Sequence, residues 1–434
     1  MVGVLIGFRT TEPILMKILW VKAGGLVPPN IGGKIRSYSI VKELAKTHKV
    51  TLFNFYAAHS DDVHSDLKPM FDQVVNLPLP IATNRGLGEL ASFARNIFSS
   101  APHTVSKYCR PEVKARMREL LASQKFDVII CDFVVAAAAI PWEVDCPKVI
   151  FTHNVEALIW KRHFEVSRNP VWKMASWGEY QKMIRFEKHY LKKSDHVLTV
   201  SEADKDFFSD FIDRSKMTVI STGVDTEYFR PDIGQEQPNS LVFTGSMDWM
   251  PNEDGVLYFL RSILPLIRRE ISDVRFTIVG RKPSEKLRAT AASEPGVQVT
   301  GTVDDIRPYV REGSVYVVPL RIGSGTRLKI FEAMAMGRAI VSTTLGAEGL
   351  PIRDGVDLSL ADRPEEFAGK VCALLRDPAE RRRLGSAARD LVEKHYSWSA
   401  VAAEFDAVLR RVAPLSISRE PKLAVQETVS ALRA

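Results

Sequence analysis

Short runs of apolar, β-branched residues alternate with longer stretches of helical periodicity along most of this chain. The first run covers residues 16–21. After a loop rich in Gly and Pro, the apolar positions of residues 37–46 repeat at helical spacing. The same alternation predicts further strands at residues 50–55, 128–131, 148–151 and 196–200. Strands that are separated by helices indicate a parallel sheet that helices cover on both faces.

The second half of the chain repeats this pattern. It predicts compact strands at residues 240–245, 275–280, 297–300, 315–319 and 339–342. Residues 221–240 lie between the halves and are rich in Gly, Pro, Asn, Asp and Gln, which is typical of a hinge. The fold class is therefore predicted to be α/β, with two doubly wound, Rossmann-like domains whose strand carboxyl ends face one another across a cleft.

The predicted organisation divides the chain into six parts. Residues 1–15 are interpreted as a loose extension, because the stronger apolar run starts at Met16. The remaining parts are an N-terminal domain at 16–222, a linker at 223–240, a C-terminal domain at 241–394, a helix that crosses back to the first domain at 395–413, and a tail at 414–434. A length of 434 residues agrees with two large domains.

The composition narrows the class of protein. With 45% apolar and 26% charged residues, the chain is typical of a globular protein rather than an extended, disordered one. Its four cysteines include no CxxC pair, which disfavours a disulfide scaffold and a structural zinc site and indicates a reducing, cytoplasmic environment. No apolar run approaches the roughly 20 residues of a membrane helix. The net charge of +7 suits anionic partners without choosing among them.

Two glycine-rich loops precede predicted helices and are candidate phosphate sites. Gly32 and Gly33 come just before the first helix, where free backbone N–H groups and the helix dipole favour an anion. The spacing is not GxGxxG, and a glycine turn that is required only for steric reasons is the alternative. The second loop leads into a helix that begins near Thr326, to which Arg327 brings positive charge.

Glu332 is the most unusual side chain of this second helix. It lies inside the apolar sequence Ile-Phe-Glu-Ala-Met-Ala, about two turns after Ser324. A carboxylate there is expensive to bury without hydroxyl partners, and a ribose diol supplies such partners. The alternative is a Glu that only the helix dipole favours.

Several blocks of sequence, taken together, resemble the family 4 glycosyltransferases of the two-domain GT-B fold. The second Gly-rich loop leads to Glu-Ala-Met-Ala at 332–335, as the Glu-x7-Glu motif of that family does. Other blocks match in the order of the family between residues 16 and 411: HNVE at 153–156, VSEAD at 200–204, STGVDTEYFRP at 221–231, FTGSMDWMPN at 243–252, VTGTVDDIRPYV at 299–310, VSTTLGAEGL at 341–350 and HYSW at 395–398. The GSMDWMPN loop is similar to that of one subgroup of these enzymes.

The resemblance implies a retaining glycosyltransferase of polysaccharide biosynthesis. Such an enzyme moves a hexose-type sugar from a nucleotide-diphosphate sugar to a glycan or lipid-linked acceptor, with the acceptor on the N-terminal domain and the donor on the C-terminal domain. The resemblance also implies that no cofactor is tightly bound and no metal is needed. The alternatives are a non-catalytic protein on the same fold that binds a sugar nucleotide or glycan, a GT-B epimerase and a phosphorylase.

Carried over residue by residue, the resemblance assigns most donor contacts to the C-terminal domain. Glu332 matches the second carboxylate of the motif, which holds the ribose. Ser324 replaces the first carboxylate, so the transferred sugar is not inferred from that position. The predicted donor-binding set is Gly32, Gly33, Gly245, Ser246, Ser324, Gly325, Thr326, Arg327 and Glu332.

The loop that follows Gly245 departs from the family pattern. Many relatives carry an Arg and a Lys there, which neutralise the leaving diphosphate, whereas residues 246–254 contain no cation. Compensation must then come from other nearby cations, and we assign this task to Arg327, with Arg321 and Lys329 as alternatives. His153 follows a predicted strand, and a His at this place in the family contacts the donor sugar or its phosphate. The predicted catalytic set is His153, Arg327 and Glu332, and a purely structural histidine is the alternative at His153.

Asp204 and Asp206 spell the DxD motif of metal-dependent transferases of another fold. They lie inside a predicted helix that Ser201 caps, so both carboxylates are expected to face solvent. No other cluster of His, Cys and acidic residues has metal-ligand spacing. We therefore expect activity without a metal ion.

Residues 160–193 are basic and aromatic. They predict either peripheral contact with an anionic bilayer at the inner face of the cytoplasmic membrane, or helices with solvated Lys and Arg faces. No nucleic-acid-binding module is recognisable, so no nucleic-acid partner is expected. The sequence does not indicate an oligomeric state.

Overall fold

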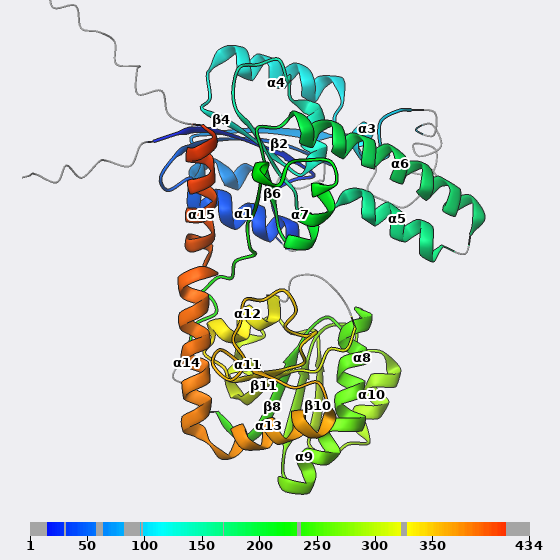
Figure 1. Ribbon diagram of the computed structural model, residues 1–434, viewed down its shortest axis with the longest axis vertical. Helices are drawn as coiled ribbons and strands as arrows, with labels where there is room; N and C mark the ends of the chain where they lie inside the picture. Colours follow the sequence, from blue (N-terminus) through cyan, green and yellow to red (C-terminus); the bar gives the residue numbers. More distant parts are fainter. Residues whose placement is uncertain are drawn as a thin grey trace, which may run out of the picture.

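The computed structural model describes residues 15–29, 32–57, 64–81, 96, 99–167, 169–231, 236–322 and 328–413. This part of the chain forms two separate parallel sheets, one above the other in Figure 1, and helices flank each of them. Four predicted site residues lie outside the described residues: Ser324, Gly325, Thr326 and Arg327. Nearly all of the predicted extension and the whole predicted tail also lie outside them.

The first sheet has the strand order β3-β2-β1-β4-β5-β6-β7. Its strands are β1 (Lys17–Ala23), β2 (Lys49–Ala57), β3 (Gln73–Leu79), β4 (Val128–Asp132), β5 (Lys148–Phe151), β6 (His196–Thr199) and β7 (Met217–Val219). The helices and 3-10 turns among them are α1 (Gly32–Leu44), η1 (Ser65–Met70), α3 (His103–Tyr108), α4 (Pro111–Ser123), η2 (Val134–Ala139), α5 (Glu156–Val166), α6 (Pro170–Lys193), α7 (Glu202–Ser209) and η3 (Arg214–Lys216). The order reverses between β1 and β4, and doubly wound sheets bind ligands outside the carboxyl ends of the strands at such a point.

Helices bury both faces of this sheet. One face packs on α1 and on α15 (Trp398–Val412), through residues such as Ile40 and Phe405. The other face packs on α4, η2 and α6, through residues such as Met117 and Met183. Because both faces are covered, the strands are apolar almost without interruption, and every residue of β4 is buried.

The second sheet has the strand order β10-β9-β8-β11-β12-β13 and reverses between β8 and β11. Its strands are β8 (Gln237–Thr244), β9 (Arg275–Val279), β10 (Val297–Gly301), β11 (Gly313–Val318), β12 (Ile340–Ser342) and β13 (Ser359–Leu360). Its helices are α8 (Met250–Tyr258), which continues through a π-helical turn (η4, Phe259–Ile263) into α9 (Leu264–Glu270), then α10 (Glu285–Ala292), α11 (Arg307–Glu312), α12 (Leu328–Ala335), α13 (Pro364–Arg376) and α14 (Pro378–His395).

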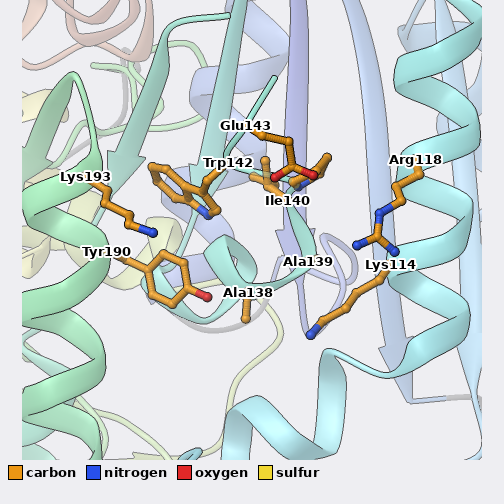
Figure 2. Close-up of a pocket in the computed structure, with 10 residues that line it drawn as sticks. Lys114, Arg118, Ala138, Ala139, Ile140, Trp142, Glu143, Tyr190 and Lys193 are labelled. Atoms are coloured by element: carbon orange, nitrogen blue, oxygen red, sulfur yellow. The ribbon is translucent and has the colours of Figure 1, made fainter. Parts of the chain in front are cut away.

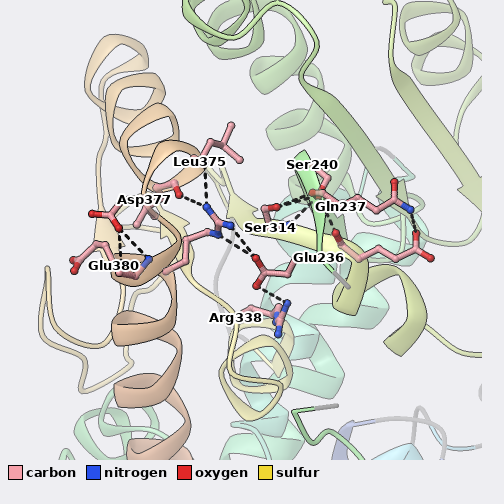
Figure 3. A network of polar contacts seen from close by, with 12 residues as sticks. Glu236, Gln237, Ser240, Ser314, Arg338, Leu375, Asp377 and Glu380 are labelled. Carbon is pink, nitrogen blue, oxygen red and sulfur yellow. Dashed lines mark hydrogen bonds and ion pairs between the residues drawn. The ribbon is translucent and has the colours of Figure 1, made fainter. Parts of the chain in front are cut away.

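The segment between the sheets is held by arginines. Arg36 of α1 donates from Nε to Thr222 Oγ1 at 3.1 Å, where the first sheet ends. Further along, Arg389 of α14 donates to the carbonyl oxygen of Phe229 at 2.8 Å. Just before β8, Glu236 accepts hydrogen bonds from Arg338 at 3.1 Å and from Arg381 at 3.0 Å (Figure 3). The described parts of the linker and its flanking residues are therefore held to both halves.

The last helix returns the chain to the first sheet (Figure 1). The indole of Trp20 and the ring of Phe405 stack with centroids 5.6 Å apart, and Phe405 also meets Phe151 edge to face at 5.3 Å. Asp406 Oδ1 lies 2.9 Å from His48 Nε2. Helix α15 is thus part of the core of the first half, although the second half precedes it in sequence.

Helices α5 and α6 pack along one another and extend away from the first sheet (Figure 1). Asn169 caps the start of α6 by accepting from the backbone N–H groups of Val171 and Trp172. At the base of the pair, the buried Glu187 accepts from the backbone N–H groups of Glu156 and Ala157 at 2.8 and 3.2 Å. The pair is therefore an ordered projection, fixed at its base.

Candidate active site

A buried ion cluster lies at the carboxyl ends of β1, β4 and β5. In the β1–β4 pairing Lys22 is directly opposite Asp132, and Lys22 Nζ is 3.0 Å from Asp132 Oδ1. Ser37 of α1 accepts a hydrogen bond from Lys22 Nζ at 2.9 Å and donates one to Asp132 Oδ1 at 3.0 Å. Trp20 Nε1 donates to the other carboxylate oxygen at 2.8 Å. Donors therefore surround the carboxylate of Asp132 and fix its position.

His153 follows β5 and joins this cluster. Its Nε2 lies 2.7 Å from Asp132 Oδ1, and its Nδ1 lies 3.2 Å from Arg36 Nη1. Because a guanidinium can only donate, Nδ1 accepts, and Nε2 carries the proton that is donated to Asp132. The residue is only 3% exposed, with its ring against Phe133 and Phe151. A substrate reaches either ring nitrogen only by replacing one of these partners, so the predicted donor contact of His153 stays a prediction.

Burial and neighbouring charges set the protonation of this cluster. Burial alone raises the pKa of Asp132, but Lys22, His153 and Ser37 together hold it well below its usual value. Burial lowers the pKa of His153 to about 4, against the opposing effect of Asp132, so the imidazole is neutral at pH 7. Burial also lowers the pKa of Arg36, to about 10, which leaves it charged. The cluster thus combines an ion pair with one additional buried cation.

The two glycines that begin α1 lie beside the cluster. A Cβ at Gly33 would lie 2.8 Å from Phe133 Cζ and 3.8 Å from His153 Nδ1, whereas a Cβ at Gly32 would have open space. The close approach of the Phe133 ring therefore requires glycine at position 33 on steric grounds alone. The phosphate contact predicted for Gly32 and Gly33 stays a prediction.

In the second sheet, the loop after β8 starts at a point of very close approach. A Cβ at Gly245 would lie 2.7 Å from Lys329 Nζ and 2.8 Å from Asn252 Nδ2. A Cβ at Gly280 would lie 1.7 Å from the carbonyl oxygen of Gly245. A side chain at either position would displace its neighbours, so this corner needs glycine at both.

Cations reach this loop from neighbouring segments. Lys282 Nζ lies 3.4 Å from Asp248 Oδ2, and two other cations contact Ser246 and Asn252. Arg281, just after β9, donates from Nε to Ser246 Oγ at 2.7 Å. Lys329, in the first described turn of α12, donates to Asn252 Oδ1 at 2.7 Å, and its Nζ lies 4.1 Å from the centroid of the Phe243 ring. The loop has no cation of its own, but the fold brings one cation to Ser246 and another to Asn252.

Glu332 lies one turn after Lys329 on α12. Its side chain is partly buried, and this burial raises its pKa to about 7, while Lys329 acts in the opposite direction. Burial raises the pKa of Tyr316, and the charge of Glu332 adds to this rise; the Tyr316 hydroxyl is 2.5 Å from Thr244 Oγ1. Within the described part of the chain no hydrogen bond is recorded for the Glu332 carboxylate. It is a desolvated carboxylate with capacity to accept hydroxyl donors.

Arg321, the other alternative for neutralising the diphosphate, is paired with Asp254. It donates from Nη2 to Asp254 Oδ1 at 2.8 Å and from Nε to Asp254 Oδ2 at 3.2 Å. Its guanidinium also lies 4.3 Å from the centroid of the Tyr258 ring. Of the two alternatives that the structure describes, Lys329 is therefore the one at Gly245. Arg327, the preferred residue of the sequence prediction, lies outside the described residues.

The DxD sequence lies in α7, whose cap Ser201 accepts from the backbone N–H of Asp204, as predicted. The prediction that both carboxylates face solvent is wrong for one of them. Asp206 is exposed and paired with Arg214, but Asp204 is partly buried, and that burial raises its pKa while Arg36 opposes the rise. Asp204 faces the ion cluster because α7 packs beside β6, the neighbour of β5.

Neither a metal-binding cluster nor a membrane-spanning helix occurs among the described residues. No group of three or more His, Cys, Asp or Glu side chains in these residues is arranged to hold a metal ion. No helix among them combines the length and apolarity that crossing a bilayer needs.

Two family models match the chain. "Glycosyltransferase Family 4" matches residues 32–228, and "Glycosyl transferases group 1" matches residues 238–377. The two matches fall on the first and the second sheet and together span most of the chain.

Individual relatives agree with these models. The chain is 22% identical over 397 residues to an uncharacterised 44.6 kDa protein in the cps region of Klebsiella pneumoniae, covering 88% of this chain and 97% of that protein. It is 29% identical over 264 residues to an MMP alpha-(1->4)-mannosyltransferase of Mycolicibacterium hassiacum, covering 58% of this chain and 62% of that enzyme. The crystal structure of Anabaena HepE in complex with UDP and glucose superposes with a TM-score of 0.58 at 14% identity, covering 91% and 99% of the two chains. The last similarity concerns the fold, and it confirms the predicted GT-B architecture.

Proposed function

We propose that this chain, which belongs to the glycosyltransferases of family 4, transfers a hexose-type sugar from a nucleotide-diphosphate sugar to a glycan or lipid-linked acceptor, with retention of configuration. Membership of the family supports a role in glycosyl transfer. The nature of the donor, the retention of configuration and the independence from metal are parts of the proposal. The HepE protein, which has the same fold, was solved with UDP and glucose, and this supports a nucleotide-sugar donor.

The observation that carries the proposal is the pair of cations at the loop after β8. Departure of a nucleoside diphosphate develops negative charge, and fixed cations that are close to this charge lower the barrier. Lys329 and Arg281 reach Asn252 and Ser246 from outside the loop. We propose that these two side chains stabilise the charge of the leaving diphosphate. With the charge compensated by protein groups, the transfer needs no divalent ion.

Glu332 completes the proposed donor site. Its carboxylate is desolvated, as the rise of its pKa to about 7 reflects. Two hydroxyl groups of a ribose would donate hydrogen bonds to it and favour the ionised form. We propose that nucleotide binding lowers the pKa of Glu332 for this reason.

The acceptor is assigned to the first half, beside the ion cluster. Arg36 and Lys22 supply positive charge at the carboxyl ends of β1 and β4, and Asp132 holds His153 in one orientation. In a same-face transfer, the leaving diphosphate accepts the proton of the attacking hydroxyl. The protein itself then has to orient the sugar acceptor and exclude water.

The experiment is a transfer assay with UDP-, GDP-, ADP- and dTDP-sugars that measures released nucleoside diphosphate and new glycoside by mass spectrometry. We expect one donor to support turnover that is unchanged by EDTA. Lys329→Ala should lower kcat by about 100-fold or more, as the loss of a charge-stabilising group does in other sites. Lys286→Ala, an exposed lysine on α10, is the matched control and should retain activity.

The products separate the rival functions. An isomeric nucleotide sugar without release of nucleoside diphosphate would identify an epimerase. Donor binding without any product, with acceptors of several classes present, would favour a non-catalytic binding protein. Loss of activity in EDTA that added Mg²⁺ or Mn²⁺ restores would contradict the assignment of the diphosphate to Lys329 and Arg281.

We further propose that the α5–α6 projection contacts an anionic bilayer at the inner face of the cytoplasmic membrane. Three apolar side chains near its tip are about three-quarters exposed: Val166 (75%), Val171 (74%) and Met174 (76%). Residues 156–193 hold nine Lys and Arg against four Glu. Exposed apolar side chains within a basic surface are typical of helices that lie at a negatively charged interface.

Sedimentation with vesicles tests this contact. We expect binding to vesicles that contain phosphatidylglycerol, little binding to pure phosphatidylcholine, and a decrease at high salt. The variant Val171→Ser/Met174→Ser should bind at least tenfold more weakly, whereas Leu15→Ser, another exposed apolar position, should bind like the wild type. Equal binding of all three proteins would contradict the proposal.

A further inference from the structure

A cavity of about 270 Å³ lies between α4 and α6, on the face of the first sheet opposite α1 and α15. Its walls carry Lys114 and Arg118 from α4, Tyr190 and Lys193 from α6, and Trp142 and Glu143 from the chain between η2 and β5 (Figure 2). None of these residues takes part in the proposed donor or acceptor site.

The cavity is distinct from the ion cluster. Trp142 lies a few residues before Lys148, which begins β5, whereas His153 follows the other end of that strand. Lys193 likewise lies shortly before β6 begins at His196. Trp142 and Lys193 therefore lie near the amino ends of β5 and β6, while the ion cluster lies at the carboxyl ends of the strands.

Three cations line the cavity, two of them together on α4 (Figure 2). Lys114 and Arg118 are one turn apart on α4, and Figure 2 shows them on one side of the cavity, with Lys193 of α6 on the other side beside Trp142 and Tyr190. Within the described residues, the acidic groups of α4 are paired with other cations, Glu112 with Arg110 and Glu119 with Arg116, and no ion pair is recorded for the three cavity cations. Like charges one turn apart on a helix repel one another, so an anion bound by Lys114 and Arg118 would relieve the repulsion.

An aromatic wall stands beside these cations. Trp142 donates from Nε1 to the carbonyl oxygen of Ala137 at 2.9 Å, which fixes the indole, and its ring centroid lies 5.3 Å from that of Tyr190. A fixed aromatic face packs against the C–H groups of a sugar ring, and Glu143 offers acceptors for sugar hydroxyls. Cations on one side and an aromatic face on the other suit a ligand that is part phosphate and part sugar.

We propose that this cavity binds a sugar that carries a phosphate group. The volume is just below the range of ordinary small-molecule pockets, about 300–1,000 Å³, which suits one sugar ring with its phosphate better than a nucleotide. Lys114 and Arg118 hold the phosphate, and Trp142 contacts the ring. The proposal does not rest on glycosyl transfer, because none of its residues belongs to the proposed donor site.

Titration calorimetry with glucose 1-phosphate, inorganic phosphate and glucose tests the site. We expect glucose 1-phosphate to bind at least tenfold more tightly than inorganic phosphate, and glucose alone to give no measurable binding. Lys114→Ala/Arg118→Ala should lower the affinity for glucose 1-phosphate at least tenfold, since two hydrogen bonds to a charged group are lost. Arg116→Ala, on the same helix but paired with Glu119, is the matched control and should bind like the wild type.

The donor site supplies the second control. Lys329→Ala should leave the glucose 1-phosphate affinity unchanged, and Lys114→Ala/Arg118→Ala should leave the response to nucleotide sugars unchanged. Glucose 1-phosphate binding that the double α4 variant retains and Lys329→Ala loses would overturn the proposal. Equal affinity for inorganic phosphate and glucose 1-phosphate, or no binding of either at 10 mM, would overturn it as well.

Discussion

Replacing Asp132 by Asn tests the ion cluster at the carboxyl ends of β1 and β4. Asn has nearly the same shape, and its one amide oxygen can still accept from Ser37, but its amide nitrogen cannot accept from Trp20 and the counter-charge of Lys22 is removed. Lys22 is 1% exposed, and its carboxylate partner is 3.0 Å away. Removal of one partner from a buried pair leaves an uncompensated charge and costs about 3–5 kcal/mol.

The protonation of Lys22 sets an upper limit to this loss. If the lysine responds by releasing its proton, the cost at pH 7 is roughly 5 kcal/mol, since it titrates near pH 10.4 in the unfolded chain and each pH unit contributes about 1.4 kcal/mol. The folded variant then binds fewer protons than the unfolded chain between pH 7 and 10. Its stability therefore rises with pH over this window, and the deficit relative to the wild type shrinks.

Urea unfolding followed by tryptophan fluorescence, at pH 7 and pH 9, measures this deficit. Glu119→Gln, which breaks the exposed ion pair with Arg116, is the control and should cost at most about 1 kcal/mol. The double variant Lys22→Met/Asp132→Asn should recover at least about 1.5 kcal/mol relative to Asp132→Asn, because the buried charge of Lys22 is removed together with that of its partner. A loss below about 1 kcal/mol for Asp132→Asn, or a double variant no more stable than the single one, would refute this account of the cluster.

Three further predictions concern other parts of the fold. Burial raises the pKa of Glu332 to about 7, so the folded state holds its proton more tightly than the unfolded chain, and unfolding free energy should fall as pH rises from about 4.5 to 7. Glu332→Gln should flatten that part of the profile in thermal unfolding, and an unchanged slope would contradict the raised pKa. Phe405→Ala should cost about 3–5 kcal/mol in urea, since the ring is fully buried against Trp20 and Phe151, and a loss below 1 kcal/mol would show that α15 is not packed there. Gly245→Ala should lower the affinity for the donor, measured by calorimetry, because the added methyl group displaces Lys329. A variant that binds the donor as tightly as the wild type would show that Lys329 does not contact the donor.

The fold was largely predictable because buried parallel strands have a strong apolar signal. The strand predicted at 148–151 is β5 as observed, and most others differ by a few residues at their ends. The missed strands are weak in sequence for physical reasons. β3 is an edge strand that contains Pro78, while β7 and β13 are three and two residues long.

The candidate site was less predictable because it depends on pairs that are remote in sequence. Lys22 and Asp132 are 110 residues apart, and only the β1–β4 pairing brings them together. Arg281 reaches Ser246 across 35 residues, so the sequence of the loop alone does not reveal this cation. One signal was available for Asp132, a charged residue at the end of an otherwise apolar run, which favours a buried and paired side chain.

The central claim is that the second half binds a nucleotide sugar through Lys329 and Glu332. The most direct measurement is thermal stability of the wild type, Lys329→Ala and Glu332→Ala against UDP-, GDP-, ADP- and dTDP-sugars, with and without EDTA. A donor at 100 times its dissociation constant should add about 2.7 kcal/mol to the wild type. We predict that one donor stabilises the wild type equally in EDTA and stabilises neither variant. No stabilisation of the wild type by any donor at millimolar concentration would contradict the claim, as would full stabilisation of both variants.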